Sequence, residues 1–403
     1  MRRLPPLTEY VSTGPIALTS EERDEIRSSV RGINLAPSPG YEGYYHLTPG
    51  PWVGAVNTTN LAIEIRPKFP ISRMLFLLSY VLDPRQWRHN QFNVSEEASL
   101  LEAIIPAFVS QVSRAFRRGI LQGYRPEEDA LATVRGRMRF DDQVRNHFGL
   151  FPPVEVRYDE FTNDIDPNRL IKAAIESLGR IAIRSGVARR SLHAFDAALE
   201  TVRLVYFDRR QIPSVAYTRL NQHYRPAVEL ARLILQSSSF EVRNGRVVAS
   251  TFLVNMNEVF EGFVVIALRE ALGLSARSFP REALGRLLFL DAEGRIKLEP
   301  DLSWWEGDMC VFVGDAKYKD AGTQGVVGGG LYQILAYTTA AGLPGGLLIY
   351  ASGSAPSITH HITRVNKDLQ VMGLDLSGAP DSILEQVQEA AQQIRQLRSR
   401  TSR

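Results

Sequence analysis

The chain of 403 residues contains a single cysteine, Cys310. One cysteine excludes an internal disulfide and any zinc site built on several thiolates. The most apolar stretch, 74–82, is far shorter than the roughly 20 residues that cross a bilayer. The opening Met1-Arg2-Arg3 is not followed by the apolar core of a secretory signal. We therefore expect a cytoplasmic protein without a membrane span or a disulfide.

Lysine is also scarce, because only six of the 47 basic residues are lysines and the rest are arginines. The net charge of +3 is too small to indicate nucleic-acid binding by itself. Two of the six lysines, Lys317 and Lys319, lie almost side by side. Lysine carries a compact ammonium whereas arginine carries a planar fork. Lys317 therefore indicates a position that requires a compact positive charge.

With 44% hydrophobic and 23% charged residues, the composition is that of an ordinary globular protein. At about 150 residues per domain, the length indicates two or three domains. Short alternating apolar runs in residues 1–94 predict a β-rich first domain. From Ser95 the apolar residues recur at helical spacing, which predicts a mainly helical region over 95–244. Residues 245–403 form the expected last domain.

Local signals place individual elements within these regions. In the first domain, a helix is expected over 19–31 and a turn at 57–60. The arginine-rich segment 134–140 is interpreted as a strand with its arginines on one face. In the middle region, the expected helices begin at Ser95 and at Asp166, each with that residue as the cap, and cover 191–204 and 226–236.

The most informative pattern is Pro300-Asp301, followed fourteen residues after the aspartate by Asp315-Ala316-Lys317. The segment between them reads as a hairpin that turns at residues 306–308. Side chains alternate along a strand, so Asp315 and Lys317 should face the same way. If Asp301 ends the paired strand, all three groups meet at one edge of a sheet.

This set suits the hydrolysis of a phosphodiester by a hard cation held on carboxylate oxygens. We expect Mg²⁺, with Mn²⁺ as an alternative, bound by Asp301 and Asp315 and by the carbonyl of Ala316. Lys317 would polarise the attacking water and stabilise the charge of the transition state. Glu261, on a predicted helix, is the expected fourth member of the catalytic set and a further metal ligand.

Supporting roles are expected for polar residues close to these positions. Glu258 lies one turn before Glu261 and can face the same way. Gln333 and Tyr337 have the i, i+4 spacing that lets both face the site from a later helix. Lys319 adds a second ammonium after Lys317.

Other motifs have simpler interpretations. The glycine tract 322–330 lacks the Lys-Ser/Thr of a phosphate-binding loop, so it is expected to be a flexible surface loop, and no nucleotide is expected on this chain. His360-His361 has no partner at metal spacing and should be solvated. Adjacent Trp304 and Trp305 should point to opposite faces, one into the core and one exposed, either as a stacking platform for DNA or as hairpin packing. The arginines of the C-terminal run are expected at a solvated helix end.

The order of elements in the last domain resembles the α-β-β-β-α-β core of the PD-(D/E)XK nucleases. Across the whole chain, a series of segments resembles the McrC family, the nuclease subunits of McrBC-type, modification-dependent (type IV) restriction systems. The segments that carry the resemblance are Ala62-Ile63-Glu64-Ile65-Arg66-Pro67-Lys68, Arg135-Gly136-Arg137, Asn168-Arg169-Leu170-Ile171-Lys172, Asn221-Gln222-His223-Tyr224-Arg225-Pro226, Met256-Asn257-Glu258-Val259-Phe260-Glu261, Pro300-Asp301, Asp315-Ala316-Lys317-Tyr318-Lys319 and Tyr332-Gln333-Ile334-Leu335-Ala336-Tyr337.

The resemblance implies an α+β multidomain chain in which a β-rich and helical N-terminal region binds a partner and a C-terminal PD-(D/E)XK domain cuts DNA. The implied partner is a hexameric McrB-like AAA+ GTPase, which residues 1–245 would contact and stimulate, with the segments near Arg66 and Arg135 as candidates. The implied substrate is double-stranded DNA that carries 5-methylcytosine or another mark, as in antiviral defence. Two alternatives remain open: a non-catalytic activator of the NTPase ring, and a stand-alone nuclease of repair or recombination.

Overall fold

The computed structural model describes residues 1–30, 32–82, 84, 99–181, 185–209, 211–243, 246–281, 287–318, 324–351 and 357–401. The chain forms two compact units. The first joins Met1–Ala103 to Thr251–Arg403, and the second is Ile104–Ser250. The β-rich beginning of the chain and the region that carries the Asp-Ala-Lys motif therefore share one unit. None of the helices in the described ranges is long and apolar enough to cross a membrane.

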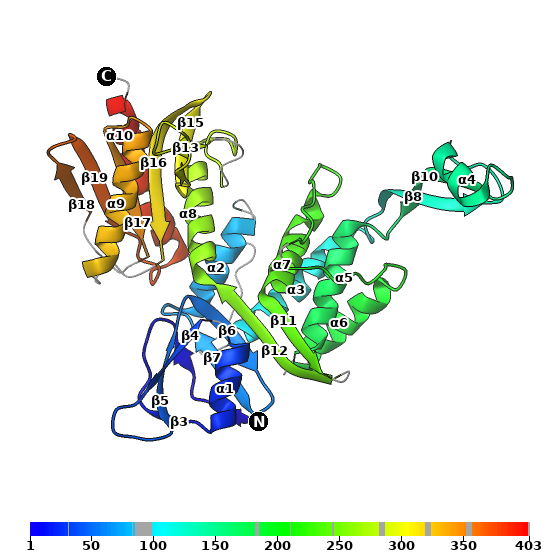
Figure 1. Ribbon diagram of the computed structural model, residues 1–403, viewed down its shortest axis with the longest axis horizontal. Helices are drawn as coiled ribbons and strands as arrows, with labels where there is room; N and C mark the ends of the chain where they lie inside the picture. The colour runs from blue at the N-terminus through cyan, green and yellow to red at the C-terminus, as the bar shows by residue number, and fades with distance from the viewer. Residues whose placement is uncertain are drawn as a thin grey trace. The chain divides into compact units, whose positions relative to one another are not determined.

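The N-terminal part of the first unit consists of two sheets that enclose an apolar core (Figure 1). The larger sheet has the strand order β1-β7-β6-β12-β11, with β2 also beside β7, and the smaller has the order β3-β5-β4. Helix α1 begins with a capping box between Thr19 and Glu22, as the predicted helix over 19–31 requires. The bounds are β1 Arg2–Arg3, β2 Leu7–Thr8, β3 Ile16–Ala17, α1 Ser20–Ser29, β4 Ile33–Pro37, β5 Tyr44–Pro49, β6 Trp52–Asn57, β7 Leu61–Arg66, β11 Ser238–Arg243 and β12 Arg246–Asn255.

Helix α2 (Ile71–Leu82) continues from this sheet and packs against α8 (Met256–Leu272). The rings of Phe76 and Tyr80 lie 5.6 Å and 5.4 Å from the ring of Phe263, both in edge-to-face geometry. The most apolar stretch of the sequence is therefore a buried helix, and it fixes the beginning of the chain to the helix that carries Glu261.

The C-terminal part of the first unit is built on a sheet of order β15-β16-β17-β19-β18. Strands β15 and β16 form an antiparallel hairpin, whereas β16, β17 and β19 run parallel. Helices α8, α9 and α10 all pack against β16 (Figure 1). The bounds are β13 Leu288–Phe289, β14 Lys297–Leu298, β15 Leu302–Glu306, β16 Met309–Lys317, α9 Gln324–Ala340, β17 Gly345–Tyr350, β18 Ile358–Ile362, β19 Lys367–Gly373 and α10 Pro380–Thr401.

The described part of the glycine tract is helical, so the expected flexible loop over 322–330 is wrong from residue 324 onward. Residues 319–323 lie outside the described ranges. A Cβ at Gly330 would come within 2.6 Å of Leu348 Cδ2 and 2.7 Å of the Tyr350 hydroxyl. Glycine at this position therefore lets α9 approach β17 closely.

The second unit contains helices α3, α5, α6 and α7 and a sheet of order β8-β10-β9. The long β8–β10 ladder projects from the helices, with α4 near its far end (Figure 1). This sheet corrects the expectation of a mainly helical region. Its strands have no buried alternating face in β8, where charged residues predominate, so period-two apolar patterning was missing. The bounds are α3 Leu100–Phe116, β8 Gly123–Leu131, β9 Arg137–Met138, α4 Phe140–His147, β10 Val154–Thr162, α5 Asp166–Gly179, α6 Gly186–Ala198 and α7 Arg225–Ser237.

Several helix starts differ from the sequence expectation. Ser95 lies outside the described residues, and Ser99 instead forms the capping pair with Glu102 before α3. The residue before α5 is Ile165, so Asp166 is its first helical residue rather than its cap. Helix α6 begins after Ser185 and ends before the predicted 191–204 helix would. In the expected strand 134–140 only β9 is extended, and the register then passes directly into α4.

Candidate active site

The predicted hairpin is present and brings the two halves of the motif together. Leu302 pairs with Gly314, so Asp301 at the start of β15 lies beside Asp315 near the end of β16. The backbone N–H of Ala316 donates to Asp301 Oδ2 at 3.1 Å. This bond fixes the Asp301 carboxylate against the strand that carries Asp315 and Lys317.

Lys317 lies between the two aspartates. Its Nζ is 2.6 Å from Asp315 Oδ2 and 3.7 Å from Asp301 Oδ2. Asp315 is 1% exposed. Burial, and then the neighbouring charge of Asp301, raise the pKa of the Asp315 carboxyl well above its usual range, while Lys317 opposes that rise. The pKa of Lys317 is also raised, because the attraction of the carboxylates exceeds the effect of its own burial.

Glu261 approaches the same group from α8. Burial raises the pKa of Glu261 to about 7, and the charge of Asp301 adds to the rise. Glu258 also raises the pKa of Glu261, but it is exposed and accepts a bond from Asn255 at the start of α8. Arg281, which the sequence analysis did not select, lies beside Gly262 and lowers the pKa of Glu261.

The supporting residues divide into those near the site and those elsewhere. Tyr337 is buried, and its hydroxyl donates to the carbonyl of Glu299 at 3.3 Å. Burial and then the charges of Asp315 and Asp301 raise the pKa of Tyr337. Gln333, one turn earlier, is exposed, and Lys319 lies outside the described residues. Tyr350 on β17 was not selected from the sequence, but it is fully buried and its pKa is raised by burial and by Asp315.

The donors gathered here are carboxylate oxygens, which suit a hard cation such as Mg²⁺. Across the described ranges, no three His, Cys, Asp or Glu side chains are already arranged around a common metal position. The Lys317 ammonium instead contacts both aspartates. It supplies to Asp301 and Asp315 the positive charge that a divalent cation would supply, and like-charged neighbours otherwise raise their pKa values. The chemistry of the donor set therefore fits the expected cation.

Both tryptophans of β15 are buried, which corrects the expectation that one is exposed. The register shifts between Trp304 and Trp305, so strict alternation does not hold there. Arg398 of α10 lies over the Trp304 ring at 5.1 Å, and the Trp305 indole N–H donates to Ser303 Oγ. Neither ring is available as a stacking platform for DNA.

The remaining motifs have ordinary structural partners. His361 pairs with Asp368 at 2.8 Å at the surface, and Arg400 contacts the same carboxylate. Cys310 is partly buried in β16, and its thiol donates to the carbonyl of Phe312. These groups take no part in the acidic cluster.

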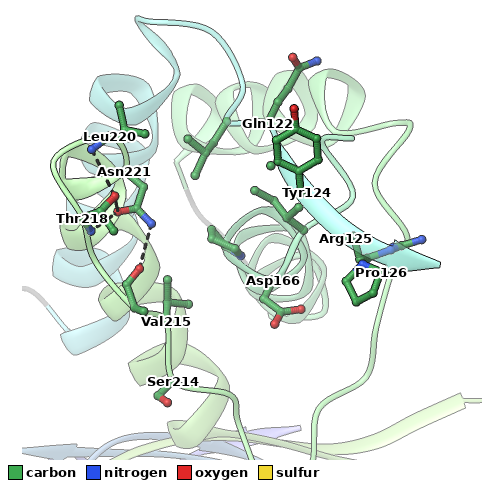
Figure 2. A pocket seen from close by; sticks show the side chains of 15 residues that line it. Gln122, Tyr124, Arg125, Pro126, Asp166, Ser214, Val215, Thr218, Leu220 and Asn221 are labelled. Carbon is green, nitrogen blue, oxygen red and sulfur yellow. Dashed lines mark hydrogen bonds between the residues drawn. The ribbon is translucent and has the colours of Figure 1, made fainter. Parts of the chain in front are cut away.

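A separate pocket of about 450 Å³ lies in the second unit, between the start of β8, the start of α5 and residues 214–221 (Figure 2). Its charged lining residue Arg125 is already paired with Asp164 and Glu127. Asn221, at its rim, is bonded to Thr218 and to the carbonyl of Ala216. The acidic cluster on β15 and β16 is therefore the better candidate for catalysis.

Comparison with known proteins agrees with this arrangement. Residues 47–351 match the family described as McrBC 5-methylcytosine restriction system component. The chain belongs to the McrBC family. No curated protein matches the sequence.

Two solved structures of the same system are similar in fold. One is a chain from the refined half-complex of the tetradecameric assembly of Thermococcus gammatolerans McrB AAA+ hexamers with bound McrC. It is 18% identical with a TM-score of 0.53, and the match covers 98% of this chain and 100% of that chain. The other is from the cryo-EM structure of the Thermococcus gammatolerans McrBC complex, with 18% identity, a TM-score of 0.41, and coverage of 67% and 88%. The mixed α/β multidomain fold is thus that of a McrBC component.

Proposed function

We propose that this McrBC-family chain is an Mg²⁺-dependent DNA endonuclease of the PD-(D/E)XK type that cuts modified DNA together with a McrB-like AAA+ GTPase hexamer. The observation that carries the proposal is the convergence of Asp301, Asp315 and Lys317 at one edge of the β15–β16 hairpin. An acidic pair with an adjacent lysine is the arrangement that metal-assisted phosphodiester hydrolysis requires.

Each residue has a distinct role in this proposal. Asp301 and Asp315 would hold the cation, with the Ala316 carbonyl and Glu261 as further oxygen donors. When bound, Mg²⁺ supplies a Lewis acid that lowers the pKa of a coordinated water. Lys317 would orient the attacking water and stabilise negative charge on the phosphate. Glu261, whose pKa is raised to about 7, would exchange protons near neutral pH.

The proposed contact with the AAA+ partner involves the projecting arm of the second unit. Phe148, Leu150 and Phe151 near α4 are 88%, 70% and 55% exposed. Clustered exposed apolar side chains indicate a protein interaction site. Arg135, at the turn of the same arm, stacks on Tyr158 and remains the arginine candidate there. Arg66 instead pairs with Glu64 in the first unit.

A non-catalytic activator of the AAA+ ring is the second candidate. The presence of the Asp301, Asp315 and Lys317 cluster argues against it, because an activator needs no such buried charges. A stand-alone repair nuclease is the third. Cleavage assays with and without the AAA+ partner separate all three: the proposal requires magnesium-dependent cutting that needs both the partner and Asp315.

A further inference from the structure

Two segments 250 residues apart in the sequence meet at the ends of the central strands. Lys68 follows β7 in the N-terminal sheet, and its Nζ donates to the main-chain oxygen of Tyr318 at 3.1 Å and of Ala351 at 3.2 Å. Tyr318 is the first residue after β16, and Ala351 is the first after β17. One ammonium therefore joins the carboxyl ends of two parallel strands.

The side chain of Tyr318 is fixed by the same N-terminal segment. Its hydroxyl donates to Glu9 Oε1, which also accepts from the backbone N–H of Lys68 at 2.8 Å. Glu9 and Tyr318 are 0% and 1% exposed. The Tyr318 ring lies 4.6 Å from the Lys68 ammonium and packs against Phe69 and Phe260. Buried polar groups that satisfy one another in this way hold a segment in one position.

These contacts surround Lys317. The side chain of Lys317 precedes Tyr318, and its carbonyl accepts from the backbone N–H of Ala351 at 3.0 Å. Lys68 therefore binds the residue that follows Lys317 and the residue that pairs with it. Any shift of these strand ends would move the Lys317 ammonium relative to Asp315 and Asp301, and displacements of about 1 Å can lower a rate by about 100-fold.

We propose that Lys68 is a positioning residue of the active centre, assisted by Glu9 through Tyr318. It fixes the ends of β16 and β17 so that Lys317 faces the two aspartates. This inference rests on the proposed nuclease function and deepens it. The N-terminal sheet then forms part of the catalytic framework, in addition to any contact that it makes with a partner.

Lys367 provides a matched control. Its Nζ also donates to two main-chain oxygens, of Thr338 at 3.2 Å and of Leu343 at 2.5 Å. These lie where α9 ends and before β17 begins, at the opposite end of the strand from Ala351. Lys367→Met removes the same kind of contact without touching the strand ends beside Lys317.

The test compares full-length wild type, Lys68→Met, Lys68→Arg and Lys367→Met, each with the AAA+ partner, Mg²⁺ and modified DNA. Single-turnover cleavage is measured over a range of DNA concentrations. Lys68→Met should lower the maximal rate by about 10- to 100-fold while the half-saturating DNA concentration stays within about threefold. Lys68→Arg should restore most of the rate, because a guanidinium can donate to both carbonyls. Lys367→Met should retain nearly the wild-type rate per folded molecule.

Hydrogen–deuterium exchange provides a second readout that does not depend on cleavage. Lys68→Met should accelerate exchange at residues 315–318 and 349–351, whereas Lys367→Met should leave these residues unchanged. The inference is overturned if Lys68→Met cuts within about threefold of Lys367→Met, or if exchange at the strand ends does not change. If wild type fails to cut at all, the proposed function fails, and the exchange comparison still decides the positioning role.

Discussion

The ammonium of Lys317 lies 2.6 Å from a carboxylate oxygen of Asp315, which is almost completely buried. A buried carboxylate and a half-buried ammonium on one strand are costly to desolvate. They are held there by the hairpin, by the bond from the Ala316 N–H to Asp301, and by the strand-end contacts of Lys68. The local fold thus maintains a charge arrangement that serves chemistry better than stability.

The identity of the cation at position 317 is the first prediction. Lys317→Arg keeps the charge but replaces a compact ammonium by a planar fork, which does not fit between Asp315 and Asp301. We expect both Lys317→Arg and Lys317→Met to reduce magnesium-dependent cleavage by about 100-fold or more. Circular dichroism should show a folded protein in each case. Cleavage by Lys317→Arg near the wild-type rate would contradict a role for the compact ammonium.

The glycines of α9 give a paired prediction on stability. Gly330→Ala places a methyl group against Leu348 and Tyr350, and should lower the free energy of unfolding by about 1–3 kcal/mol. Gly329→Ala meets no neighbour within 4 Å and should raise it by up to about 1 kcal/mol. Denaturant unfolding of the two variants checks the difference. Equal effects would mean that α9 does not approach β17 as closely as described.

Burial raises the pKa of Glu9 to about 7 in the folded chain, from 4.5. The folded state therefore binds the proton more tightly, so the stabilisation is complete below about pH 4.5 and is lost as the pH rises through 7. Glu9→Gln should remove up to about 3 kcal/mol of this fall in the free energy of unfolding. Thermal or denaturant unfolding between pH 5 and 8 measures it.

The exposed Glu42→Gln serves as the control for that experiment. Its pH dependence should match that of wild type. Glu261 and Asp315 contribute a fall of the same sign, so the informative quantity is the difference between wild type and Glu9→Gln. Parallel curves for these two proteins would show that Glu9 is not a buried proton-binding group.

The apolar tip of the arm is predicted to act in partner stimulation. Phe148 has a left-handed backbone with φ 54°, a conformation that asparagine adopts readily. Phe148→Asn should therefore leave the melting temperature unchanged or slightly higher, yet reduce stimulation of the partner's NTPase by about tenfold or more. Tyr41→Asn, at a comparably exposed ring in the first unit, should leave stimulation intact. Full stimulation by Phe148→Asn would exclude this surface from the contact.

The sequence predicted best where one local pattern determined the structure. The alternation around Asp315 and Lys317 and the turn at 306–308 were sufficient to predict the hairpin. The capping residues likewise predicted α1. The β8–β10 arm was missed because its strands are largely solvated and carry charge on both faces.

Long-range packing accounts for the other differences. Nothing in the glycine tract itself reveals that Gly330 contacts Tyr350, which makes α9 longer than predicted. The scarcity of lysine was informative, but more broadly than expected. Lys68, Lys172 and Lys367 each donate to two main-chain oxygens, a task suited to a compact ammonium with three donors. The contact of Lys68 with Tyr318 could not be read from either segment alone.

The most direct test of the account is magnesium-dependent cleavage of modified DNA by the full chain with its AAA+ partner, comparing Asp315→Asn with Asp308→Asn. Asp308 lies exposed in the hairpin turn, so its substitution controls for changes to the same hairpin. The account predicts that Asp315→Asn abolishes cutting while partner NTPase stimulation persists, and that Asp308→Asn cuts as wild type does. Undiminished cutting by Asp315→Asn would contradict it.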